Sequence, residues 1–220
     1  MRFRVSGRDI VFDDGGMNLL SSDALRELRD AIAPLAKSDQ PLLTFRFVRS
    51  AGADMNEMVG FTAEEAMRFS RDGQETFGAI ERLPMLTVAL IDGDCFGGAL
   101  DLAMAFDLRF ASPRSRFSHP GARLGIVTGF GGTSRWRKIV GRTAAHALLL
   151  ANETLSAEEA ARIGLVDRVA DDHEDELRRL ETLDVATTRF LKELTLHSDA
   201  LTQSQLLHLA SRLGELYRVQ

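Results

Sequence analysis

Apolar and polar positions along the chain follow two spacings that predict strands and helices in turn. Residues 2–5 and 9–12 alternate enough to predict two short strands, and residues 42–48 and 86–91 are largely apolar, as is typical of buried strands. Apolar side chains also recur at helical spacing over residues 25–35, after serines that can cap a helix N-terminus. The first half of the chain therefore predicts strands and helices in close succession.

Further helices are indicated by two capping boxes, in which a hydroxyl accepts from a main-chain N–H and a glutamate three residues later reaches back. Thr-Ala-Glu-Glu at residues 62–65 predicts a helix that continues to about Arg82. Ser-Ala-Glu-Glu at residues 156–159 predicts a short helix that Gly164 ends. Residues 143–150 also follow helical spacing.

Short strands and a helical C-terminal stretch complete the pattern. Residues 108–111, 116–118 and 165–169 predict strands, so two strands and a helix recur loosely along the chain. This recurrence favours an α/β fold of stacked ββα turns over a simple alternation of strand and helix. We assign residues 1–170 to this α/β core and residues 171–220 to a C-terminal helical region. The apolar positions of that region are Leu191, Leu194, Leu206, Leu207, Leu213 and Leu216.

Composition and charge narrow the classes of function. The chain has 220 residues, of which 45% are hydrophobic and 27% charged, so it is long enough for one domain with a substantial core. Its net charge of −5 argues against a nucleic-acid partner and against attraction to acidic membranes. No apolar run approaches the length of a membrane span, and residues 1–5 show no signal-peptide pattern.

The single cysteine, Cys95, can form no intrachain disulfide, which agrees with a reducing compartment. We therefore expect a cytoplasmic protein. The thiol itself is best explained as a small buried hydrophobic group. No set of cysteines and histidines has metal-ligand spacing, so we expect no metal site, and no Gly-x-x-x-x-Gly-Lys loop indicates nucleotide hydrolysis.

A Gly-Gly pair at residues 97–98 is the first candidate for chemistry. It follows an apolar strand and precedes an apolar helix that continues through Ala105. The free N–H groups at such a helix start can hold negative charge, and glycine lets a ligand approach the backbone closely. Taken alone, the pair is better explained as a tight packing turn. Asp101, in the first turn of the helix, could equally be a residue that the helix dipole favours.

Several longer motifs around this pair carry a resemblance to a known family. Gly-Gly-Ala at residues 97–99 is followed by Ala-x-Asp-x-Arg-x-Ala at residues 105–111 and by Leu-Gly-Ile-x-x-Gly-x-Gly-Gly-Thr at residues 124–133. Ser-Ala-Gly-Ala-Asp at residues 50–54 precedes them, and Ser-Ala-Glu-Glu-Ala at residues 156–160 follows. In this order and at this spacing, the motifs resemble those of the enoyl-CoA hydratase/isomerase (crotonase) family.

The resemblance implies a right-handed crotonase-like spiral of ββα turns that binds an acyl-CoA thioester, with no covalently bound cofactor. It implies that the N–H groups of Ala53 and Gly98 form an oxyanion hole, which stabilises the charge that develops on the thioester oxygen. It further implies that coenzyme A, as part of the substrate, contacts the two loops that carry these groups. The residues concerned are Ala51, Gly52, Ala53, Met55, Gly97 and Gly98.

The proton-transfer residues are where this chain departs from the family pattern. Asp101 matches the first of the two glutamates that hydratases use, and the resemblance implies that it is the base, with a water or the substrate as its partner. The second position, after Pro120, is Gly121, which cannot transfer a proton. His119 lies beside this position and is either a supporting residue or a substitute acid and base.

Two classes of function follow from this pattern. The first is an enzyme that hydrates or isomerises an enoyl-CoA thioester, or catalyses a related reaction, through an enolate. The second is a catalytically weak protein that binds a CoA thioester or supports a partner enzyme, which Gly121 and a short C-terminal region motivate. An unrelated α/β hydrolase is disfavoured, because no Gly-x-Ser-x-Gly elbow occurs.

The resemblance also implies a homotrimer, or a hexamer that is a dimer of trimers, in which C-terminal helices pack against neighbouring subunits. The apolar positions after residue 170 fit such helices and equally fit a lid on the chain's own core. The Arg-Trp-Arg cluster at residues 135–137 could be a subunit contact. Several cations could meet the phosphates of coenzyme A or be solvated surface. These are Arg46, Arg49, Arg135, Arg137 and Lys138.

Overall fold

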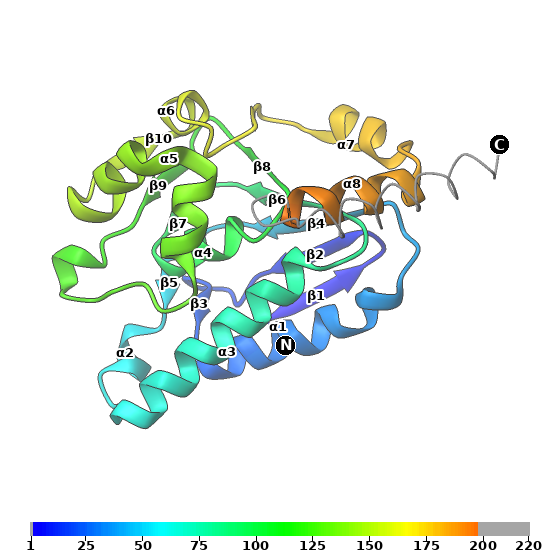
Figure 1. Cartoon of the computed structure of the whole chain (residues 1–220). Coiled ribbons are helices and arrows are strands. Elements are labelled where there is room, and N and C mark those ends of the chain that lie inside the picture. Colours follow the sequence, from blue (N-terminus) through cyan, green and yellow to red (C-terminus); the bar gives the residue numbers. More distant parts are fainter. Residues whose placement is uncertain (1, 198–220) are drawn as a thin grey trace.

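A computed structural model of the chain describes residues 2–197, and of residues 196 and 197 the backbone only. Its largest sheet has six strands in the order β1-β2-β4-β6-β8-β11 (Figure 1). The hairpin of β1 and β2 is antiparallel, whereas every later pair of neighbours in this sheet is parallel. The strands are β1 (Phe3–Ser6), β2 (Asp9–Phe12), β4 (Leu42–Phe47), β6 (Leu86–Ile91), β8 (Leu108–Ala111) and β11 (Arg168–Val169).

Helices cover both faces of this sheet, which explains the nearly continuous apolar runs of its central strands. Figure 1 shows α1 (Ser22–Ile32) and α3 (Ala63–Glu81) on one side of the sheet and α7 (Glu174–Glu181) on the other. Side chains alternate between these faces. Phe45 belongs to the core that includes α1 and α3, whereas Val88 packs with the buried leucines of α7.

Two smaller sheets are formed by strands that come after strands of the large sheet along the chain. β9 (Arg116–Ser118) lies between β7 (Asp94–Phe96) and β10 (Thr154–Ser156), and β3 (Leu19–Leu20) pairs with β5 (Gly52–Ala53). Along the chain, a strand of the large sheet, a strand of a small sheet and a helix recur three times, as β4-β5-α3, β6-β7-α4 and β8-β9-α5. This recurrence is the stacked ββα arrangement that the sequence predicts.

Local hydrogen bonds set most helix starts. Ser21 caps α1 by accepting from the Ala24 N–H, and both predicted capping boxes form, at Thr62 and Ser156. These signals involve neighbours in sequence, so the sequence alone is sufficient to predict them. The remaining helices are α2 (Met55–Met58), α4 (Gly98–Ala103), α5 (Gly132–Leu150), α6 (Ala157–Arg162), α8 (Val185–His197) and the 3₁₀ turns η1 (Ala33–Lys37) and η2 (Ala122–Leu124).

Two predicted elements have wrong boundaries in the second half of the chain. The strand expected at residues 165–169 is shorter, because Leu165 donates its N–H to the carbonyl of Ala160 in the turn that ends α6, and only the last two residues pair with β8. The helix expected at residues 143–150 forms the second part of α5, after Gly141, whose φ of 75° and ψ of 172° interrupt the helix. The part of α5 from Gly132 to this interruption is not predicted.

The stretch around the Gly-Gly pair also differs from the prediction. Asp94 lies in β7, a strand that the sequence does not predict, and accepts two hydrogen bonds of 2.8 Å from Arg116. The helix that follows ends at Ala103, short of Ala105. A strand of three residues is too short to show a period that distinguishes it from a turn.

The C-terminal helices rest on the chain's own sheet. Leu177 and Leu180 of α7 are buried in the cluster that includes β6 and β8, and Phe190 of α8 is also buried. Lys192 of α8 donates to a carboxylate oxygen of Asp107 over 2.7 Å. Contacts of this kind fit a helical cover on the chain's own core.

Most of the predicted apolar positions of the C-terminal region lie outside the described residues, namely 206, 207, 213 and 216. Leu191 lies on α8 and is exposed. The division of the chain at residue 170 stays a prediction. Among residues 2–197, the longest apolar helices still fall short of what a bilayer crossing requires.

We expect Lys192→Met to lower the free energy of unfolding by about 3 kcal/mol, because it leaves the largely buried Asp107 carboxylate without its cation. The N–H and the hydroxyl of Thr87 would still donate to that carboxylate, over 2.8 Å each. Urea denaturation measures the change. Arg26→Met removes an exposed ion pair with Asp23 and is the control, which should change stability little. Equal losses in both variants would contradict a specific role for Lys192.

Candidate active site

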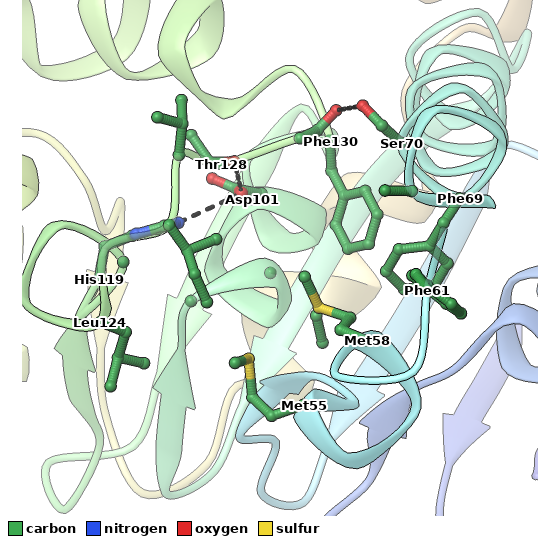
Figure 2. A pocket seen from close by; sticks show the side chains of 18 of the residues that line it. Met55, Met58, Phe61, Phe69, Ser70, Asp101, His119, Leu124, Thr128 and Phe130 are labelled. Atoms are coloured by element: carbon green, nitrogen blue, oxygen red, sulfur yellow. Dashed lines mark hydrogen bonds and ion pairs between the residues drawn. The ribbon is translucent and has the colours of Figure 1, made fainter. Parts of the chain in front are cut away.

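A cavity of about 600 Å³ opens between α2, α3, the start of α4 and the segment at residues 119–130. Figure 2 shows Met55, Met58 and Phe61 across this cavity from Asp101 and His119. Most of the predicted site residues line it, whereas Gly52 is buried behind the wall and does not. The predicted residues that line the cavity are Ala51, Ala53, Met55, Gly97, Gly98, Asp101 and His119.

The apolar side of the cavity is built on α3. Phe130 packs between Phe69 and Phe77, with ring centroids 5.1 and 5.3 Å away. Ser70 and Gln74 hold the turn before Phe130, because both donate to the carbonyl of Gly129, over 2.6 and 2.7 Å. This aromatic wall suits an apolar group of a ligand.

The loop that contains Ala53 is positioned by β3. The N–H of Asp54 donates to the carbonyl of Leu20 over 3.1 Å. Because successive N–H groups along a strand point to opposite sides, the N–H of Ala53 points away from β3. The hydroxyl of Ser50 donates to the carbonyl of Asn18 over 2.6 Å and anchors the start of the loop.

The turn at Gly97 and Gly98 is positioned by β9. Gly97 has a φ of 53° and a ψ of −125°, a conformation that L side chains rarely adopt, and its N–H donates to the carbonyl of Ser118 over 2.9 Å. The Leu100 and Asp101 N–H groups both donate to the Gly97 carbonyl. Within the part of the chain that the structure describes, no main-chain acceptor binds the N–H of Gly98.

Gly52 explains how the two loops come together. Its φ is +93°, and a Cβ at this position would lie 2.6 Å from the Phe96 carbonyl oxygen and 2.7 Å from the Gly98 nitrogen. A Cβ on Gly98 would in turn lie 3.2 Å from the Ala53 nitrogen. The two predicted N–H donors therefore belong to loops in direct contact, and only glycine fits between them.

Asp101 is held by three protein side chains. Trp136 Nε1 donates to Oδ1 over 3.2 Å, the Thr128 hydroxyl donates to Oδ2, and His119 Nε2 lies 3.3 Å from Oδ2. The residue is only 1% exposed, although it borders the cavity. The sequence predicts a water or the substrate as its partner, whereas the structure shows a protein network, because three distant segments converge on this carboxylate.

His119 lies beside the Gly-Gly turn in the folded chain. Phe96 of β7 pairs in parallel with Ser118 of β9, so the residue after Ser118 lies beside the residue after Phe96. The imidazole is buried, with 5% of the residue exposed, and stands edge-on to the Trp136 ring at 6.3 Å between centroids. The side chain of His119 thus joins the wall that contains Gly98 and Asp101.

Trp136 and Thr128 are site residues that the sequence does not indicate. The sequence permits a subunit contact at residues 135–137, whereas Trp136 is fully buried against Asp101. Gly132 lies one helical turn earlier on α5, and a Cβ there would come 2.0 Å from Asp101 Oδ1. The spacing of glycine and tryptophan by four residues is the signal that could have placed both on one helix face.

Two of the cations considered for phosphate binding are engaged elsewhere. Arg135 forms two hydrogen bonds with the Glu81 carboxylate, over 2.8 and 2.9 Å, and a third with the Phe130 carbonyl. Arg46 pairs with Asp9. Arg135 is therefore a clamp between α5 and α3, and its largely buried side chain does not fit the alternative of solvated surface.

Cys95 is a buried residue of β7, as the sequence predicts. No part of it is exposed, and burial raises the pKa of its thiol, an effect that Asp101 and Asp94 strengthen. A thiol in this state is a poor nucleophile at neutral pH. Within residues 2–197, no three histidine, cysteine or acidic side chains come together as a metal site.

The fold and the cavity define an α/β spiral protein in which two backbone turns and a buried carboxylate–imidazole pair meet at an apolar pocket. The chain belongs to the enoyl-CoA hydratase/isomerase family, whose sequence model matches residues 10–213. Family membership confirms the resemblance that the motifs carry.

Curated relatives are similar over most of this chain. It is 37% identical over 165 residues to the crotonyl-CoA hydratase of Syntrophomonas wolfei subsp. wolfei, a match that covers 72% of this chain and 63% of that protein. It is 36% identical over 163 residues to the short-chain-enoyl-CoA hydratase of Clostridium acetobutylicum, with 72% and 62% covered. The chain therefore spans less than two thirds of the length of these relatives.

Solved structures share the whole fold. DspI of Pseudomonas aeruginosa superposes with a TM-score of 0.88 at 27% identity, over 99% of this chain and 95% of that one. An enoyl-CoA hydratase from Thermoplasma volcanium gives a TM-score of 0.91 at 26% identity, over 100% and 93%. The predicted crotonase-like α/β fold class is thus confirmed.

Proposed function

We propose that this chain is an enzyme that acts on an acyl-CoA thioester and hydrates or isomerises an enoyl group through an enolate. The observation that carries this proposal is the contact between the two loops that contain the Ala53 and Gly98 N–H groups, at a cavity that also holds Asp101 and His119. Family membership supports it, as does the similarity to a crotonyl-CoA hydratase and a short-chain-enoyl-CoA hydratase.

In the proposed reaction, the thioester oxygen accepts hydrogen bonds from both N–H groups. Negative charge grows on this oxygen when carbon α loses a proton or when carbon β is attacked. Fixed donors stabilise that charge, and the loss of one such donor typically costs about 3 kcal/mol in the transition state. The remaining steps are proton transfers, for which Asp101 and His119 are the candidates that border the cavity.

Coenzyme A takes part as the carrier of the acyl group, and we propose no covalently bound cofactor. The loop at residues 51–55 and the turn at residues 97–98 would contact its pantetheine end. Met58, Phe61 and Phe130 would then contact the acyl chain, since they form the apolar side of the same cavity.

The proposal is tested by calorimetry with crotonyl-CoA and butyryl-CoA, paired with two turnover assays. One assay follows hydration of crotonyl-CoA, and the other follows isomerisation of 3-hexenoyl-CoA to 2-hexenoyl-CoA. We expect both thioesters to bind and at least one reaction to be catalysed. A chain that binds neither thioester would contradict any role in CoA chemistry.

One observation favours a second candidate function, a catalytically weak protein that binds CoA thioesters or supports a partner enzyme. Gly121 stands where the family pattern has its second carboxylate, and a Cβ there would lie 2.8 Å from the Ile126 carbonyl oxygen. Binding of both thioesters without turnover in either assay would select this candidate.

The resemblance to the family supports an assembly of several subunits, and the location rests on the single buried cysteine, Cys95. We propose a homotrimer, or a dimer of trimers, in the cytoplasm. Light scattering on the eluting peak of a size-exclusion column should give three or six times the 24.3 kDa chain mass. A monomeric mass would contradict this assembly.

A further inference from the structure

We propose that His119 is the residue that moves protons in this site, through Nδ1, and that Asp101 is a positioning residue that holds the imidazole. This inference rests on the proposed function and specifies its chemistry. In it, His119 replaces the carboxylate that is absent at Gly121.

The hydrogen bonds of Asp101 leave its carboxylate little capacity for substrate. The indole N–H of Trp136 can only donate, so Oδ1 must accept. Oδ2 already receives the Thr128 hydroxyl and faces His119 Nε2. Gly132 closes the side next to Oδ1, where even a methyl group would lie 2.0 Å away. A carboxylate enclosed in this way is suited to orienting a neighbour.

The same contacts assign the tautomer of His119. Opposite a carboxylate oxygen that already accepts from Thr128, Nε2 carries the hydrogen and donates. Nδ1 then presents a lone pair. No protein atom among the described residues forms a hydrogen bond with Nδ1. When Nδ1 takes up a proton, the Asp101 carboxylate stabilises the imidazolium that forms.

The free nitrogen lies beside the vacant carboxylate position. A Cβ on Gly121 would lie 3.3 Å from both Nδ1 and Cε1 of His119. The imidazole therefore borders the space that the first atoms of a side chain at position 121 would need. Glycine at this position leaves room for the ring, and the ring supplies the titratable group that glycine lacks.

The location also suits proton transfer to the acyl group. His119 and Gly98 each lie one residue beyond the hydrogen bond that joins Gly97 to Ser118, so base and oxyanion donor are neighbours across two paired strands. Nδ1 would take a proton from carbon α or carbon γ of an enoyl thioester. The C–H electron pair would enter the conjugated system as a dienolate, with its negative charge on the thioester oxygen.

Return of the same proton to the other carbon completes a double-bond shift, in which no atom is gained or lost. Hydration would require a second group to activate water, and the Asp101 oxygens are already engaged. We therefore expect isomerisation to be faster than hydration in the two turnover assays.

The test is His119→Gln, because a glutamine amide can still donate to Asp101 but has no basic nitrogen. Exchange of the carbon α protons of butyryl-CoA in D₂O, followed by NMR, reports proton abstraction directly. We expect exchange and isomerisation to fall by about 10²–10⁴-fold, with calorimetric affinity for butyryl-CoA nearly unchanged. His146→Gln, at an exposed position of α5, is the matched control and should exchange at the wild-type rate.

Two further readouts separate catalysis from a structural role. The exchange rate of His119→Gln should stay low at saturating butyryl-CoA, because the variant lacks the basic nitrogen and not the binding site. Added imidazole should restore exchange to His119→Gly, in which the ring is deleted. Wild-type exchange in His119→Gln would overturn the inference. Failure of the wild-type protein itself to bind butyryl-CoA would instead contradict the proposed function.

Discussion

Asp101→Asn should lower turnover of an enoyl-CoA thioester by about 10²–10⁴-fold while binding is retained. The substitution keeps the shape of the side chain but converts one oxygen to an amide. Because the Trp136 N–H needs an acceptor, the remaining carbonyl oxygen faces Trp136 and the amide nitrogen faces His119. Nε2 must then accept, so the proton moves to Nδ1 and the free lone pair of Nδ1 is lost.

The measurement is the turnover number of the isomerisation assay beside calorimetry with butyryl-CoA. Asp94→Asn is a suitable control, since Asp94 belongs to the neighbouring strand, pairs with Arg116 and does not border the cavity. It should retain the wild-type rate. A wild-type rate for Asp101→Asn would exclude Asp101 both as the base and as the positioning residue.

Gly52→Ala should reduce turnover by about 100-fold, because the added Cβ must push the loop of Ala53 away from Gly98. The Cβ would lie within 2.7 Å of two backbone atoms, which cannot rotate away as side chains do. The positive φ of Gly52 adds strain, so we also expect a loss of about 1–3 kcal/mol in the free energy of unfolding.

Gly7→Ala separates these two effects. Gly7 has a φ of +57°, and a Cβ there would meet no atom within 4 Å. This control should show backbone strain in urea denaturation and normal turnover. If Gly52→Ala also turned over at the wild-type rate, the two N–H groups would not need their present spacing, and the oxyanion hole would be refuted.

The elements that the sequence predicts well are those that short-range contacts determine. The capping boxes at Thr62 and Ser156 close within three residues, and the strand at residues 86–91 is an apolar run that only Thr87 interrupts. β7 is different, because its identity depends on pairing with β9 some twenty residues later. A strand of three residues is too short to show an apolar period. The sequence of β7 therefore does not reveal a pairing partner that lies so far along the chain.

In the candidate site, too, some residues could be predicted from the sequence and others could not. Family motifs indicate Ala53, Gly98 and Asp101, which the structure brings to one cavity. The partners of Asp101 come from residues 18, 27 and 35 positions further along the chain, so neither spacing nor composition connects them. A polar atom buried with its partners is a property of packing, and only the folded chain shows which donors surround it.

The pairing of β7 with β9 has a consequence for how such a site can diversify. One hydrogen bond ties the start of α4 to the strand before His119, so the chemical side of the cavity is built as a single rigid unit. The opposite side comes from α2 and α3, where Met55, Met58 and Met67 present flexible thioethers. Substitutions there can alter which acyl chain fits and leave the reacting groups in place, so substrate range and reaction type can evolve separately in this protein.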